Sequence, residues 1–144
     1  MPDIPRHRRR PPMGLNKVGV VKDTTDVELV HPMSGEVLTN DDGSAMTITV
    51  YGPYSDFYKK TMHAQQNKRL AKAQRMGGKM NLTAEELEAG ALDLLVKCTK
   101  GWKITLDEGL EKFSEAKVRE VYTELPWVRD QVEAVMGDTR AFLG

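Results

Sequence analysis

The chain has 144 residues with a formal net charge of zero, 40% of them hydrophobic and 29% charged. These values suit one small domain with tails and do not favour a large, dry enzyme core. The single cysteine, Cys98, excludes an intrachain disulfide and favours a reducing compartment, and no run approaches the roughly 20 apolar residues that span a bilayer. The charges are unevenly placed, because residues 1–80 carry 13 Lys/Arg against 8 Asp/Glu and residues 81–144 carry 8 against 13.

Residues 1–20 predict a disordered basic arm, since "MPDIPRHRRRPPMGLNK" is rich in Pro and Arg and has almost nothing to bury. Its cationic cluster consists of Arg6, Arg8, Arg9 and Arg10. Such a cluster can neutralise backbone phosphates of a nucleic acid. The simpler interpretation is a solvated tail, because no aromatic residue is interleaved for base stacking.

Residues 21–53 predict a small antiparallel β segment. Apolar residues alternate in "DVELVHP", "MSGE" and "NDDG" are turn signals, and "AMTITVYG" is a β-branched run with Met46, Ile48 and Val50 on one face. A sheet of two or three such strands is marginal alone and must pack against a helix.

Residues 54–144 predict a helical domain with a hinge near residues 76–82, at "MGGKM". Its first helix spans about 54–76, with Ser55 as the N-cap. From Lys59 to Lys79 this helix carries seven cations and no acid. It either docks onto an acidic partner or nucleic acid, or is neutralised by the acidic C-terminal half, which is the interpretation we favour from sequence.

The next helix opens with the capping-box spacing of "TAEE", with Thr83 as the N-cap. We expect Gly101 to end it in a left-handed conformation. Trp102, Ile104 and Leu106 then alternate with polar residues, which predicts a short strand or extended loop. The apolar stripe expected on the helix consists of Leu87, Ala91, Leu94, Leu95 and Cys98.

The C-terminal segment predicts two helices separated at Leu125-Pro126-Trp127. Ser114 can cap the first, and Pro126 breaks the chain while suiting the first turn of the second. The second helix is expected to end near Gly137 or to fray through Phe142. The apolar positions expected to face inward are Val118, Val121, Tyr122, Val128, Val132 and Val135.

No catalytic or cofactor motif rises above background: the sequence has no phosphate loop, no dinucleotide-binding glycine pattern, and only three scattered histidines. We therefore expect no enzyme activity, no cofactor and no metal. The predicted fold class is α+β, with a small N-terminal antiparallel β segment followed by a mostly α-helical body.

Two segments resemble the tail assembly chaperones of long-tailed (siphovirus-type) bacteriophages. One is "ELVHPMSGEVLTNDDGSAMTITVYGPYS", residues 28–55, with its glycine turns and its strand that runs into "GP-x-S". The other is "GWKITLDEGLEKFSEAKVREVYTELPWVRDQV", residues 101–132, with a Trp-centred segment, "G-x-x-x-x-FS" and a late "PW-[VI]-x-x-QV" helix.

The resemblance implies a chaperone in viral tail morphogenesis that binds the phage tape-measure protein and helps recruit tail-tube subunits. It also implies action in the host cell cytoplasm during infection and absence from the mature virion. The charge split further suggests a homo-oligomer. The alternative is a nucleic-acid-binding or virion structural protein that uses the Arg-rich arm.

The C-terminal helices either complete the core or form one wall of a groove for a helical client. The candidate partner-binding residues are Trp102, Phe113, Tyr122, Pro126, Trp127, Val128 and Val132.

Overall fold

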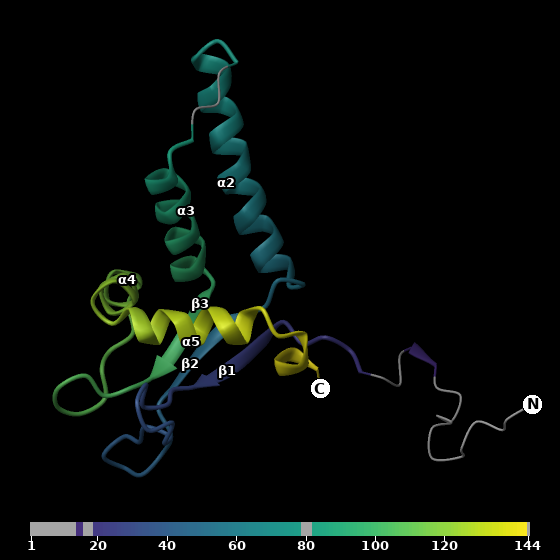
Figure 1. The fold of residues 1–144 in the computed structure, drawn as a ribbon. Helices are drawn as coiled ribbons and strands as arrows, with labels where there is room; N and C mark the ends of the chain where they lie inside the picture. Colours follow the sequence, from purple (N-terminus) through teal and green to yellow (C-terminus); the bar gives the residue numbers. More distant parts are fainter. Residues whose placement is uncertain (1–13, 16–18, 79–81, 144) are drawn as a thin grey trace, which may run out of the picture.

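The fold is a three-stranded antiparallel sheet with helices packed on it and a helical hairpin that projects from it (Figure 1). The structure is a computed structural model that describes residues 14–15, 19–78 and 82–143. It confirms the predicted α+β class. The elements in chain order are β1 (Thr24–Glu28), β2 (Thr47–Tyr51), α2 (Asp56–Arg75), α3 (Ala84–Lys97), β3 (Thr99–Lys103), α4 (Glu115–Glu124), α5 (Pro126–Met136) and the 3-10 turn η2 (Thr139–Phe142).

The sheet has the order β1-β2-β3, so the central strand is β2. Ile48 of β2 pairs with Val27 of β1 on one side and with Trp102 of β3 on the other. The third strand therefore comes from the region predicted as helical body, and it begins three residues before the alternating Trp102–Leu106 pattern. Gly101 was wrongly predicted as a helix C-cap: α3 ends at Lys97 with Cys98 as its C-cap, and Gly101 pairs with Thr49 inside the sheet.

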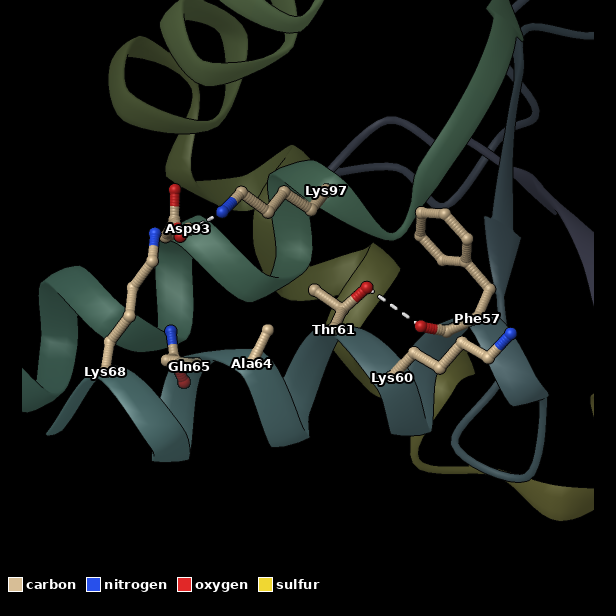
Figure 2. Close-up of a pocket in the computed structure, with 8 residues that line it drawn as sticks. All are labelled: Phe57, Lys60, Thr61, Ala64, Gln65, Lys68, Asp93 and Lys97. Carbon is tan, nitrogen blue, oxygen red and sulfur yellow. Dashed lines mark hydrogen bonds and ion pairs between the residues drawn. The ribbon is translucent and has the colours of Figure 1, made fainter. Parts of the chain in front are cut away.

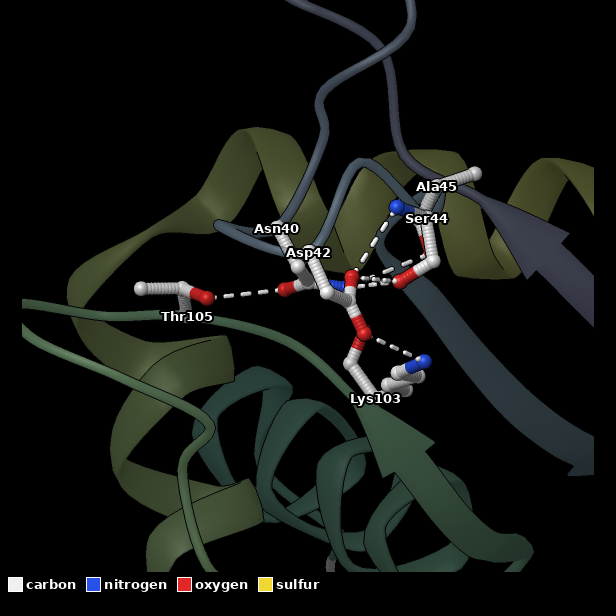
Figure 3. A network of polar contacts seen from close by, with 6 residues as sticks. All are labelled: Asn40, Asp42, Ser44, Ala45, Lys103 and Thr105. Atoms are coloured by element: carbon white, nitrogen blue, oxygen red, sulfur yellow. Dashed lines mark hydrogen bonds and ion pairs between the residues drawn. The ribbon is translucent and has the colours of Figure 1, made fainter.

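The segment between β1 and β2 folds over the end of the sheet and is fixed by the buried side chain of Asn40 (Figure 3). The Asn40 amide donates to Ser44 Oγ and to the Lys103 carbonyl oxygen, each at 3.2 Å, and its Oδ1 accepts from the Thr105 hydroxyl at 2.8 Å. Asp42 accepts from the Ser44 hydroxyl and pairs with Lys103 Nζ at 2.9 Å. The hydrogen bonds from Ser44, together with the bond from Lys103, hold the pKa of Asp42 well below its usual range. This network joins the turn to β3.

The hairpin α2–α3 stands away from the sheet, and most of its surface is exposed (Figure 1). Its helices begin where predicted, because Ser55 Oγ accepts from the Tyr58 amide and Thr83 Oγ1 from the Glu86 amide, both at 3.1 Å. Only Ala73 of α2 is buried. Residues 77–78 turn the chain with positive φ at both glycines, and residues 79–81 of the predicted hinge lie outside the described residues.

The prediction that the apolar stripe of α3 faces the core is wrong for the first half of the helix. Leu87 is 49% exposed and Ala91 is also exposed, because the N-terminal half of α3 faces α2, which offers few apolar side chains, and does not reach the sheet. Full burial in the core is reached in the last turn, with Leu95, Val96 and the cap residue Cys98, while Leu92 and Leu94 pack against the core half-buried. Burial raises the pKa of the Cys98 thiol to about 11, which fits an inert core position.

Helices α4 and α5 close the core over the sheet. Ser114 Oγ accepts from the Lys117 amide at 3.1 Å, and Pro126 occupies the first turn of α5, both as predicted. The chain does not fray after α5, because Phe142 of η2 is 1% exposed and its carbonyl accepts from the Lys22 amide at 2.6 Å. One core thus unites the strands, the end of α3, α4, α5 and η2; its buried members include Val27, Leu29, Ile48, Val50, Ile104, Val118, Val121, Val132 and Met136.

Candidate functional site

Three of the predicted partner-binding residues lie in the core. Tyr122 is 1% exposed, Val128 2% and Val132 0%. The Tyr122 hydroxyl and Thr99 Oγ1 share a buried hydrogen bond of 2.7 Å, and burial raises the pKa of Tyr122 to about 12. For these side chains the structure supports the core alternative, since the domain itself covers almost all of their surface.

Trp102 and Phe113 form an aromatic pair at the surface. Their ring centroids lie 5.5 Å apart in an edge-to-face arrangement, and Trp102 Nε1 donates to the Glu111 carbonyl oxygen at 3.0 Å. Phe113 is 36% exposed. The pair fixes the loop between β3 and α4, because an edge-to-face contact and a satisfied indole N–H both favour one geometry.

The remaining predicted residues, Pro126 and Trp127, face two different hollows. Trp127 and Val128 line an apolar slot of about 190 Å³ against the end of the sheet, next to Leu29. Pro126 is exposed and lines a separate hollow on the α3–α4 side. The predicted set is therefore distributed over the core, a surface pair and two hollows, and does not form one groove.

Another apolar hollow lies between the foot of the α2–α3 hairpin and α5, and we name it the α5 cleft. Its volume is about 390 Å³, within the roughly 300–1,000 Å³ of ordinary ligand sites. One wall comes from α3 and the other from α5. Its lining residues of apolar character are Pro53, Tyr58, Ala91, Leu94, Leu95 and Met136.

The charges of the α5 cleft are few and neutralise each other. Arg129 Nε donates to Glu133 Oε1 at 2.7 Å, one turn apart on α5. Partial burial raises the pKa of Tyr58, the other ionisable group of the lining, so this side chain stays neutral at physiological pH. An apolar floor with a paired, polar rim suits the apolar face of a helix from another protein.

Sequence reasoning missed the α5 cleft because four separate chain segments build it. Within each helix the spacing is regular: Arg129, Glu133 and Met136 stand at i, i+4 and i+7 on one side of α5. Ala91 and Leu94 belong to the stripe predicted for α3. The signal available was the incomplete burial of that stripe, since apolar residues without an internal partner are candidates for an external one.

A further hollow of about 340 Å³, the α2–α3 groove, runs along the other side of the hairpin (Figure 2). Lys60 and Lys68 of α2 and Lys97 of α3 line it together with the carboxylate of Asp93. Figure 2 shows Lys60 and Lys68 near the two ends of the α2 side of the groove, with Asp93 and Lys97 on α3 across from them.

The basic helix is not neutralised by direct contact with the acidic half of the chain. Among the described residues, the ion pairs involve Lys97, Lys103, Lys117, Arg119, Arg129 and Arg140, and none involves a cation of α2. The interpretation favoured from sequence is therefore wrong at the level of ion pairs within this part of the chain. Seven cations were counted from sequence; Lys79 lies outside the described residues.

The Arg6, Arg8, Arg9 and Arg10 cluster lies outside the described residues, so its predicted role stays a prediction. No helix in the described part of the chain is long and apolar enough to cross a membrane. Residues 14–15, 19–78 and 82–143 contain no group of three side chains suited to hold a metal ion. Comparisons with protein-family models, with curated proteins and with solved structures find no match for this chain.

Proposed function

We propose that this protein is an assembly chaperone that holds an apolar helical segment of another protein in the α5 cleft. The observation that carries the proposal is the cleft itself: an exposed apolar floor beside the paired charges of Arg129 and Glu133. Ala91 is a small residue at this floor, so a partner helix can approach the backbone of α3 closely. Enzyme chemistry finds less support, because the lining offers no nucleophile beside a base.

We infer the identity of the client from the resemblance to phage tail assembly chaperones. The "PW-[VI]-x-x-QV" segment ends at Val132, and it supplies Arg129 to the α5 cleft. We therefore propose that the client is the tape-measure protein, and that tail-tube subunits are recruited to the same complex in the host cell cytoplasm. A long, apolar, helical client has the surface that such a cleft would cover during assembly.

Co-expression with the tape-measure protein tests the proposal, with the soluble and co-purifying fraction of the client as the readout. Ala91→Glu places a charge at the floor of the α5 cleft and leaves the core intact, because Ala91 is exposed and helical. The matched control is Ala116→Glu on the exposed side of α4. We expect the parent chain and the Ala116→Glu variant to hold the client in solution, and the Ala91→Glu variant to lose about tenfold of the complex.

Equal client recovery with Ala91→Glu and Ala116→Glu would refute the α5 cleft as the client site. Failure of the parent chain to recover any client would refute the chaperone function itself. Val132→Asp is unsuitable as a test, because Val132 is 0% exposed and a buried carboxylate unfolds the domain.

A second candidate function, nucleic-acid binding, is favoured by the cations of α2 that lack an ion pair among the described residues. Titration with single-stranded DNA at several salt concentrations separates the two. For phosphate contacts, log affinity falls with log salt with a slope of about −0.7 for each contact on a single strand, whereas apolar capture in the α5 cleft changes little with salt.

A further inference from the structure

The α2–α3 groove combines free positive charge with a surface that a helix can approach. Lys60 and Lys68 have no ion pair within the described residues, and the groove's one carboxylate, Asp93, is already engaged. Asp93 Oδ2 pairs with Lys97 Nζ at 3.2 Å, and Asp93 Oδ1 pairs with Arg119 Nη2 at 2.7 Å. The groove therefore offers positive potential with no internal carboxylate left to neutralise it.

The cations continue along one side of α2 beyond the groove. From Lys60, the next cations on that side are Lys68, Lys72 and Arg75, at i+8, i+12 and i+15. At 1.5 Å of rise per residue they extend over about 22 Å of helix. Thr61 and Ala64, which line the groove between Lys60 and Lys68, are small and allow another backbone to come close.

The end of the groove nearest the sheet is apolar, and an aromatic stack fixes its position. Phe57 is 42% exposed, and its ring stacks on that of Tyr51 with centroids 4.3 Å apart and an interplanar angle of 20°. The stack holds Phe57 at the end of the groove nearest the sheet. The surface thus changes from an aromatic contact at Phe57 to positive charge at Arg75 along one helix side.

We propose that the α2–α3 groove binds an acidic amphipathic helix of a partner protein, laid alongside α2. Carboxylates of the partner pair with Lys60, Lys68 and the cations beyond them, and an apolar residue at one end of the partner contacts Phe57. This site goes beyond the client cleft proposed above. The two hollows use different sides of α3, since Asp93 and Lys97 line one while Ala91, Leu94 and Leu95 line the other.

An acidic helix fits this surface better than a nucleic acid does. One face of Phe57 is covered by Tyr51, which leaves a single ring face for the successive bases that single-strand binding proteins stack. The i+8, i+12 and i+15 spacing of cations is also the spacing at which carboxylates of a parallel or antiparallel helix lie on one side.

The probe is a fluorescein-labelled helical peptide of about 20 residues with glutamates at the spacing of the four α2 cations and leucine at one end. The test variant is Lys60→Gln with Lys68→Gln, and the matched control is Lys59→Gln with Lys112→Gln. The control removes the same charge from exposed positions outside the groove. We expect fluorescence anisotropy to give about a tenfold weaker affinity for the test variant and less than a twofold change for the control. A peptide with the same composition and scrambled glutamates is expected to bind more weakly than the probe.

Three outcomes would overturn the proposal. An equal loss of peptide affinity in the test and control variants would mean that the peptide is attracted by the net charge of the protein and not by the groove. Loss of peptide binding only when Arg6, Arg8, Arg9 and Arg10 are changed to glutamine would place the contact on the basic arm. Tighter binding of an oligothymidylate than of the peptide, lost in the test variant, would make the groove a nucleic-acid site. Circular dichroism of each variant confirms that α2 is retained, which is expected because the replaced lysines are exposed.

Discussion

The contact between Gly52 and Phe142 predicts an unusually sensitive glycine. Gly52 is buried directly after β2, and a Cβ at this position would lie 2.7 Å from Phe142 Cε1 and 2.8 Å from Cδ1. Ordinary carbon contacts are about 3.5–4 Å, so the ring would have to move by nearly 1 Å. Phe142 is 1% exposed, and neighbouring side chains block that movement.

We expect Gly52→Ala to destabilise the fold by about 1–3 kcal/mol, the usual cost of overpacking a filled core. The φ of Gly52 is not positive, so the backbone itself accepts alanine and the cost measures the steric contact alone. At about 3 °C per kcal/mol for a domain of this size, the midpoint of thermal unfolding should fall by about 3–9 °C. Urea unfolding followed by circular dichroism gives the free energy directly.

Gly101→Ala is the matched control, because a Cβ added at Gly101 would meet no heavy atom within 4 Å and the φ of this residue is not positive. We expect this variant to be neutral or more stable by about 0.4–1 kcal/mol, since alanine lowers the entropy of the unfolded chain. Replacing the ring by a smaller side chain with Phe142→Val should remove most of the penalty of Gly52→Ala in a double-mutant cycle. A Gly52→Ala variant as stable as Gly101→Ala would refute the reasoning.

Three further predictions concern the polar contacts of the fold. Asn40→Ala should cost about 2–4 kcal/mol in urea unfolding, because it removes the hydrogen bonds that join the 40–45 turn to β3. Thr83→Ala should cost about 1 kcal/mol through loss of the N-cap of α3, measurable as faster amide exchange in its first turn. Burial raises the pKa of Cys98 to about 11 and that of Tyr122 to about 12. The resulting stability is complete below about pH 8 and is lost as the pH rises toward 12, by about 2–3 kcal/mol for each group. The double variant Cys98→Ala/Tyr122→Phe should flatten this alkaline loss in urea titrations; an unchanged loss would contradict the assignment.

Local features of the fold could be predicted from the sequence. The three N-caps at Ser55, Thr83 and Ser114 and the helix start at Pro126 depend on residues within one turn of each other. The α+β class followed from hydrophobic periodicity, which is also local. These predictions hold because no distant part of the chain alters the chemistry that produces them.

Features that depend on distant partners were predicted poorly. The spacing of Leu87 and Ala91 marks an apolar stripe, but only the tertiary structure shows that α3 meets the sparsely apolar α2 at this end. Gly101 has the residue type of a helix cap, yet pairing with β2 places it in a strand. The α5 cleft joins Pro53, Tyr58, residues 91–95 and residues 129–137, so no local pattern could reveal it.

The connection between β2 and β3 has a consequence for the order of folding. These strands are hydrogen-bonded neighbours, yet residues 52–98 join them and include the whole α2–α3 hairpin. Closing a long flexible loop costs entropy that rises with the logarithm of its length. Two antiparallel helices bring the ends of this segment close together through local contacts, which form in microseconds. Formation of the hairpin therefore places β3 next to β2. Lengthening both helices by the same number of turns should leave the rate at which β3 pairs with β2 nearly unchanged.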